Sequence, residues 1–121
     1  MEINLTIPWP PKINQCWQAD KNKWLITNSG SEYKQFIKYI FMKSAQKPFK
    51  RTDKLAIGLV FYPHASIKRK LTEMVDVCLE AIQDAGVYAN DYQIKKIYME
   101  MKPKADIGAV HVKIWSLESD D

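Results

Sequence analysis

One apolar segment and the helical pattern that follows it place the strongest constraint on how this chain folds. Residues 55–62 read LAIGLVFY, a run typical of a buried central strand, and Pro63 ends it because proline cannot donate a ladder hydrogen bond. From Leu71 to Ala85 apolar side chains recur at helical spacing, and Gly86 stands where a left-handed helix cap is expected. This part of the chain therefore predicts a buried strand followed by an amphipathic helix.

The patterns around this unit predict more strands and a second helix. Residues 2–7 alternate polar and apolar as a half-buried strand does, and a helix is expected to begin near Ser29, which has capping-box spacing to Glu32. Residues 12–23 are expected to form a loop. The order strand, helix, strand, helix, strand, strand predicts one α+β domain over residues 1–121, with a mixed sheet of about four strands and two helices packed on it.

The first helix is expected to bury one apolar face, formed by Tyr33, Phe36, Ile37, Ile40 and Phe41. Its lysines, Lys34 among them, fall largely outside this face and are expected to meet solvent or a partner. Two more strands are expected at residues 93–101 and 109–117, joined by a turn.

Charge is distributed unevenly along the 121 residues, whose formal net charge is +4. Residues 1–72 carry 13 lysine and arginine residues against 4 acidic ones, whereas residues 73–121 carry 5 against 10. A basic half favours a polyanionic partner, because contacts to phosphates release bound counterions. No apolar run is long enough to span a membrane and no signal-peptide pattern opens the chain, so a cytoplasmic protein is expected. Cys16 and Cys78 show no metal-ligand spacing and are expected to be free thiols.

Two segments carry a family resemblance. They read IPWPPKINQCW at residues 7–17 and KRKLTEMVDVCLEAIQDAGVYAND at residues 68–91. Their layout resembles the RusA family of Holliday-junction resolvases, which are small, magnesium-dependent, phage-type endonucleases acting in recombination and repair. The resemblance implies a RusA-like fold, a homodimer, Mg²⁺ as cofactor and branched DNA as partner.

The motif that carries catalysis in this family is altered here. The family opens the helix with D-x-D-N-x-x-K and completes its magnesium site with an aspartate from the next loop. At those positions this chain has Lys70, Thr72, Glu73 and Asp76, and only Asp91 matches the family pattern.

Two interpretations of these acids stay open. In the first, they form a solvent-exposed stripe on the helix, and the protein binds DNA without cutting it. In the second, Glu73, Asp76 and Asp91 hold a relocated metal ion and Lys70 supplies the positive charge, which would make the protein a Mg²⁺-dependent, structure-selective endonuclease with these four catalytic residues.

Two basic clusters are the predicted DNA-contacting surfaces, because lysine and arginine position a protein on phosphates. Their residues are Lys68, Arg69 and Lys70 in one cluster, and Lys47, Lys50, Arg51 and Lys54 in the other. Asn14 follows the WPP segment and is expected to help shape the site. A different class of function is also open, in which an inactive RusA homologue binds a host or phage protein partner.

Overall fold

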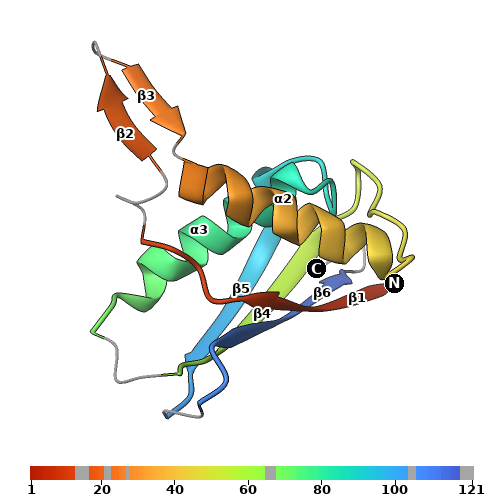
Figure 1. Cartoon of the computed structure of the whole chain (residues 1–121). Coiled ribbons are helices and arrows are strands. Elements are labelled where there is room, and N and C mark those ends of the chain that lie inside the picture. The colour runs from red at the N-terminus through yellow and green to blue at the C-terminus, as the bar shows by residue number, and fades with distance from the viewer. Residues whose placement is uncertain (13–16, 21–22, 27, 65–67, 104–105, 118–121) are drawn as a thin grey trace.

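The computed structural model describes residues 1–12, 17–20, 23–26, 28–64, 68–103 and 106–117, and of residues 17–20 and 23–26 it describes only the backbone. In chain order its elements are β1 (Glu2–Pro8), β2 (Trp17–Asp20), β3 (Lys23–Ile26), α2 (Asn28–Lys43), β4 (Leu55–Tyr62), α3 (Leu71–Asp84), η1 (Asp91–Gln93), β5 (Ile94–Met101) and β6 (Ala109–Ser116). Figure 1 labels the helices and strands.

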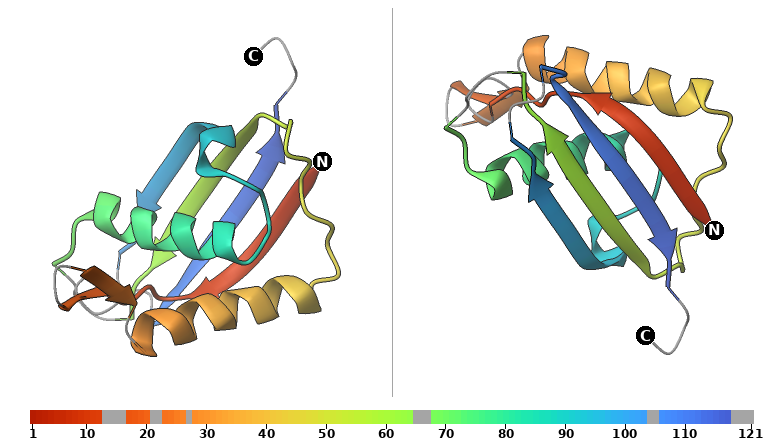
Figure 2. Two further views of the ribbon diagram at one scale, coloured as in Figure 1. Left: turned by 90° about the horizontal axis from the view of Figure 1, so that it is seen from above. Right: turned by 90° about the horizontal axis from the view of Figure 1, so that it is seen from below.

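Four strands form one mixed sheet, and both helices lie on the same face of it. The strand order is β1-β6-β4-β5, with β4 and β5 parallel and the other neighbours antiparallel. Figure 2 shows α2 and α3 together on one face, while no helix lies over the other face. The predicted α+β fold, with a four-stranded mixed sheet and two helices, is confirmed.

The core lies between β4 and the helix layer. Alternate side chains of β4 are fully buried in one cluster with residues of both helices, and they are Leu55, Ile57, Leu59 and Phe61. The helix α3 faces them with a continuous apolar stripe and ends at Ala85, after which Gly86 adopts a φ of 84°. The predicted strand, the predicted amphipathic helix and its glycine cap are therefore all confirmed.

Residues 17–20 and 23–26 form two paired strands, so the loop expected over residues 12–23 is wrong in part. The strands β2 and β3 pair antiparallel, with Trp17 opposite Ile26 and Asp20 opposite Lys23. Each strand has only four residues, which is too short for a period-two pattern to stand out in the sequence.

The helix α2 buries a different set of side chains from the one predicted. Its buried residues are Gly30, Tyr33, Ile37 and Phe41. Phe36 is 56% exposed, whereas Lys34, expected to face solvent or a partner, places Nζ 2.8 Å from Glu80 and 2.6 Å from Asp84 of α3. The reason is that α2 contacts β1 and α3 at once, so its covered face is turned toward the neighbouring helix. Within the described parts of the chain, no helix is long and apolar enough to cross a membrane.

Candidate nucleic-acid interface

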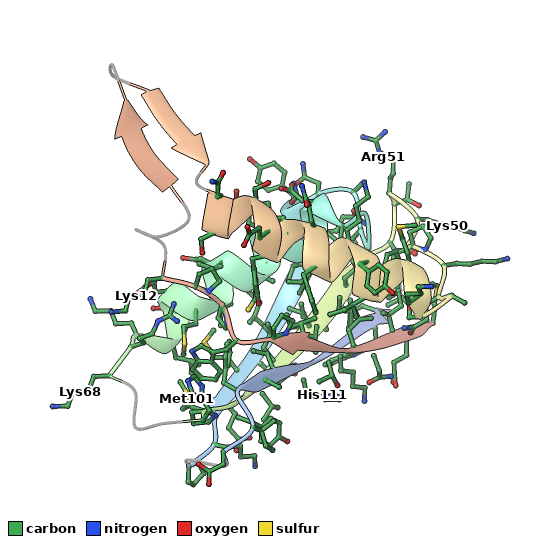
Figure 3. All side chains as sticks on the ribbon, viewed as in Figure 1. Lys12, Lys50, Arg51, Lys68, Met101 and His111 are labelled. Carbon is green, nitrogen blue, oxygen red and sulfur yellow. The ribbon has the colours of Figure 1, made fainter. Side chains whose placement is uncertain are left out.

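The predicted site residues lie at two opposite ends of the molecule. Lys68 precedes α3 on the same side as Lys12, whereas Lys50 and Arg51 lie at the far side, in the basic connection (residues 44–54) between α2 and β4 (Figure 3). All four of these side chains are exposed. The structure therefore does not bring the two predicted basic clusters together on one chain.

Arg69 is buried beneath the proline-rich segment and does not reach solvent as a phosphate contact requires. Its side chain is 7% exposed, Nη1 donates to the Pro10 oxygen at 2.6 Å, and Nη2 donates to the Pro11 oxygen at 3.0 Å. Nη2 also lies 3.5 Å from Oε1 of Glu73, one turn along α3. The guanidinium thus ties the chain that leaves β1 to the start of α3.

A second side chain, Tyr33 of α2, also holds the proline-rich segment in place. The Tyr33 hydroxyl donates to the Pro8 oxygen at 2.8 Å and lies 3.7 Å from Sγ of Cys78. Burial raises the pKa of Cys78 to about 12, while the hydrogen bond between Cys78 and Tyr33 and the charge of Arg69 act in the opposite direction. Cys78 is therefore a protonated free thiol at neutral pH, as predicted. Cys16 lies outside the described residues.

Asp91 lies in the acidic turn (residues 88–93) that follows α3. Its Oδ1 is 2.7 Å from the Tyr88 hydroxyl, which also lies 3.1 Å from the Leu79 oxygen of α3. Burial, the hydrogen bond with Asp91 and the charge of Asp91 all raise the pKa of Tyr88, so this hydroxyl keeps its proton. Asn90 caps η1 by accepting from the Tyr92 amide at 2.8 Å. The one carboxylate that matches the family pattern is therefore held against the helix.

The buried side chain of Gln93 joins the acidic turn to the basic connection. Its Nε2 donates to the oxygens of Lys50 and Asp53, at 2.8 and 2.9 Å. Its Oε1 accepts from the amides of Ala89 and Asn90, at 3.0 and 3.1 Å. Because an amide offers two donors and two acceptor lone pairs, all four bonding positions are used. The basic connection is thus fixed relative to the acidic turn.

A hollow of about 450 Å³ lies between these two segments. It is lined by Arg51, Thr52, Asp53, Lys54, Ala89, Asn90, Tyr92, Gln93 and Lys95. Three of these residues are cations, and the ring of Tyr92 is 84% exposed beside them. This end of the molecule therefore combines positive charge with an accessible aromatic ring, next to Asp91.

The residues at the family's metal positions do not fit Mg²⁺. Lys70 and Thr72 are exposed at the start of α3 and offer a repelling ammonium and a neutral hydroxyl, where a hard cation needs several carboxylate oxygens. Glu73 is ion-paired with an arginine. Among the described residues, no three His, Cys, Asp or Glu side chains are grouped so that they could hold a metal ion. Glu73, Asp76 and Asp91 are accordingly not brought together as one metal site.

Sequence reasoning missed the residues that hold both ends in place. The sequence could have indicated a role for Gln93, because this residue follows the family's loop aspartate by two positions. Tyr33 was expected only as an apolar residue, Lys95 lay in a segment predicted only as a strand, and no role was predicted for Tyr92. Asn14, expected to shape the site, lies outside the described residues.

Replacing Gln93 by leucine is expected to lower the free energy of unfolding by about 2–4 kcal/mol, because two amides and two carbonyls lose a buried partner. Urea unfolding followed by circular dichroism measures the change. Gln35→Leu is the matched control, since the side chain of this exposed glutamine of α2 makes no hydrogen bond to another described residue, and it is expected to change stability by less than about 0.5 kcal/mol. Equal effects of the two substitutions would contradict the role assigned to Gln93.

In a Cys16→Ser background, Cys78 is expected to resist iodoacetamide at pH 8 until the protein unfolds. Its pKa rises on folding from 9.0 to about 12, so between these values the unfolded chain holds fewer protons and stability falls as pH rises. Unfolding free energies measured from pH 7 to pH 11 should therefore decline less steeply for Cys78→Ala than for the parent. Parallel curves, or fast labelling of the folded protein, would show that the thiol is not buried.

Comparison with known proteins supports one family. No family model matches the chain. The chain is 25% identical over 118 residues, covering 98% of both sequences, to a protein of Enterobacteria phage HK97 described as crossover junction endodeoxyribonuclease rusA. This similarity confirms the resemblance predicted from the sequence, and it supports membership of the chain in the RusA family.

Proposed function

We propose that this protein binds branched DNA, with four-way junctions as its preferred form. The observation that carries the proposal is the similarity to a phage crossover junction endodeoxyribonuclease over nearly the whole chain. The exposed basic residues support it, because lysine and arginine side chains at the surface bind phosphates by releasing counterions.

The positions of the basic residues suit a branched partner. One group, with Lys12, Lys68 and Lys70, lies at the start of α3, and the other, with Lys50 and Arg51, lies at the opposite end of the molecule (Figure 3). A single straight duplex meets only one face of a small domain, whereas arms that diverge from a junction can contact two ends. The separation of the two groups therefore favours branched over linear DNA.

We propose further that this protein acts by binding branched DNA without cleaving it in a metal-dependent reaction. Lys70 and Thr72 stand where the family has aspartates, and Glu73 is paired with Arg69. The relocated site formed by Glu73, Asp76 and Asp91 is the alternative, and it requires these acids to move together around a cation.

A labelled four-way junction and a linear duplex of the same length test both statements. We expect tighter binding to the junction, an affinity that falls steeply with salt, and no nicking with Mg²⁺ or Mn²⁺. Replacing Lys50 and Arg51 by alanine should make the slope of log affinity against log salt shallower by about two. The control pair, Lys38→Ala and Lys43→Ala on α2, should leave the slope unchanged.

Two outcomes of that experiment would overturn the proposal. Equal affinity for junction and duplex, or binding that salt does not weaken, would contradict junction binding and favour a protein partner. Metal-dependent paired nicks at the junction would contradict action by occupancy, and Asp76→Asn and Asp91→Asn would then be the variants expected to abolish them.

We propose that the protein forms a symmetric dimer through β5, since family members are expected to work as homodimers. The other sheet edge, β1, is closed by Gln46, whose side-chain amide accepts from the Asn4 amide and donates to the Asn4 oxygen, both at 3.1 Å. The edge of β5 has no such cover among the described residues, and it exposes Ile97, Tyr98 and Met99. An uncovered edge strand with apolar side chains is a template for pairing with another strand.

The sequence of β5 is self-complementary for such pairing. A two-fold axis at Tyr98 sets two copies antiparallel, with Lys96 of one copy opposite Glu100 of the other, and Ile97 opposite Met99. Opposite charges and apolar side chains that face each other across strands both stabilise a pair.

Ile97→Glu is expected to convert the dimer into a monomer, because it places a carboxylate among apolar side chains of the other copy. Sedimentation velocity at micromolar concentration measures the change. Ile107→Glu is the control, since Ile107 is also exposed but lies between β5 and β6, and it should leave the dimer intact. A wild-type protein that is monomeric, or an Ile97→Glu protein that remains dimeric, would contradict this interface.

A further inference from the structure

A second and larger hollow lies at the end of the molecule where α2 and α3 begin. Its volume is about 670 Å³, within the range of roughly 300–1,000 Å³ that is usual for small-ligand sites. It is lined by Pro8, Trp9, Pro10, Pro11, Lys12, Ser29, Glu32, Tyr33, Phe36, His64 and Arg69. We call it the aromatic pocket, and nothing in the metal chemistry of the family assigns it a role.

Contacts with neighbouring residues fix the aromatic side chains that line the pocket. Trp9 packs edge-on against Phe61 of the core, with 5.8 Å between ring centroids, and edge-on against His64 at 6.3 Å. Tyr33 is fixed by the hydrogen bond from its hydroxyl to the Pro8 oxygen. Such rings offer flat surfaces that need little reordering when a flat ligand stacks on them, so the walls favour a planar, aromatic occupant.

The guanidinium of Arg69 forms part of the pocket wall and places a positive charge beside it. Both terminal nitrogens of the guanidinium are occupied by the carbonyls of Pro10 and Pro11, but Nε is fully buried and has no partner among the described residues. A buried donor without an acceptor costs free energy, and native structures rarely leave one unexplained. The guanidinium therefore carries an unsatisfied N–H beside the pocket, with no acceptor among the described residues.

We infer that the aromatic pocket receives an unpaired nucleobase displaced from the branch point of the DNA. The base stacks on the ring of Phe36, which is 56% exposed. Every base has a π-face, so the pocket needs no particular sequence. Lys12 lines the pocket, and Lys68 lies on the same side of the molecule, where both can meet the adjoining phosphates (Figure 3).

This inference rests on the proposed binding of branched DNA, and it adds the site that senses the branch. Phe36 is the residue that tests it, because it is 56% exposed and its truncation leaves the core intact. Tyr39 is a close control, since it lies on the same helix, is 57% exposed and does not line the pocket.

The experiment places 2-aminopurine at the branch point of a four-way junction, where its fluorescence rises when the base leaves the stack. Wild-type protein and Tyr39→Ala are expected to raise the fluorescence on binding. Phe36→Ala is expected to lose most of that rise and to bind the junction about 5- to 150-fold more weakly, the loss associated with one stacked base. Thermal unfolding followed by circular dichroism verifies that both variants are folded.

The outcomes separate this inference from the proposed function. If wild-type protein binds the junction without a rise in fluorescence, or if Phe36→Ala matches Tyr39→Ala, the pocket does not take a base and junction binding stands. If wild-type protein binds no junction, the proposed function fails and the inference fails with it. The wild-type response decides the matter even if the Phe36 variant does not fold.

Discussion

The guanidinium of Arg69 is the contact on which one whole end of this molecule depends. It joins the prolines after β1 to the start of α3, and Tyr33 of the helix α2 is hydrogen-bonded to the same proline-rich segment through the Pro8 oxygen. A buried arginine costs several kcal/mol unless its charge and donors are satisfied. Glu73 offsets the charge and two carbonyls accept from its terminal nitrogens, so the positions of all three segments are determined together.

This use of Arg69 changes how the altered catalytic motif is understood. Lys70 and Thr72 are exposed and offer no carboxylate, so Glu73 is the one acidic side chain in the first turn of α3, and it is ion-paired with the buried arginine. The start of this helix is tied to the proline-rich segment and carries the exposed Lys68 and Lys70. The proposed binding of DNA without cutting rests on this combination of exposed lysines with few carboxylates.

Sequence patterns predicted those parts of the fold that depend on periodicity. The strand over residues 55–62, the helix after it and the left-handed Gly86 each follow from local spacing. The rest depends on contacts between distant segments. Nothing in the run Lys68, Arg69, Lys70 shows which of the three side chains is buried, and two of the four hydrogen bonds of Gln93 reach carbonyls that are 43 and 40 residues away. The DNA-contacting residues remain predictions, except that Arg69 is shown to be buried.

The central claim is that branched DNA contacts both ends of the molecule at once. Amide hydrogen exchange with and without a saturating four-way junction measures this directly, because each segment reports separately. We expect the amides of residues 44–54 and of residues 68–73 to exchange more slowly in the same complex, while the exchange rates of the core strand β4 stay unchanged. Protection at neither end, or at the exposed face of α2 alone, would contradict it.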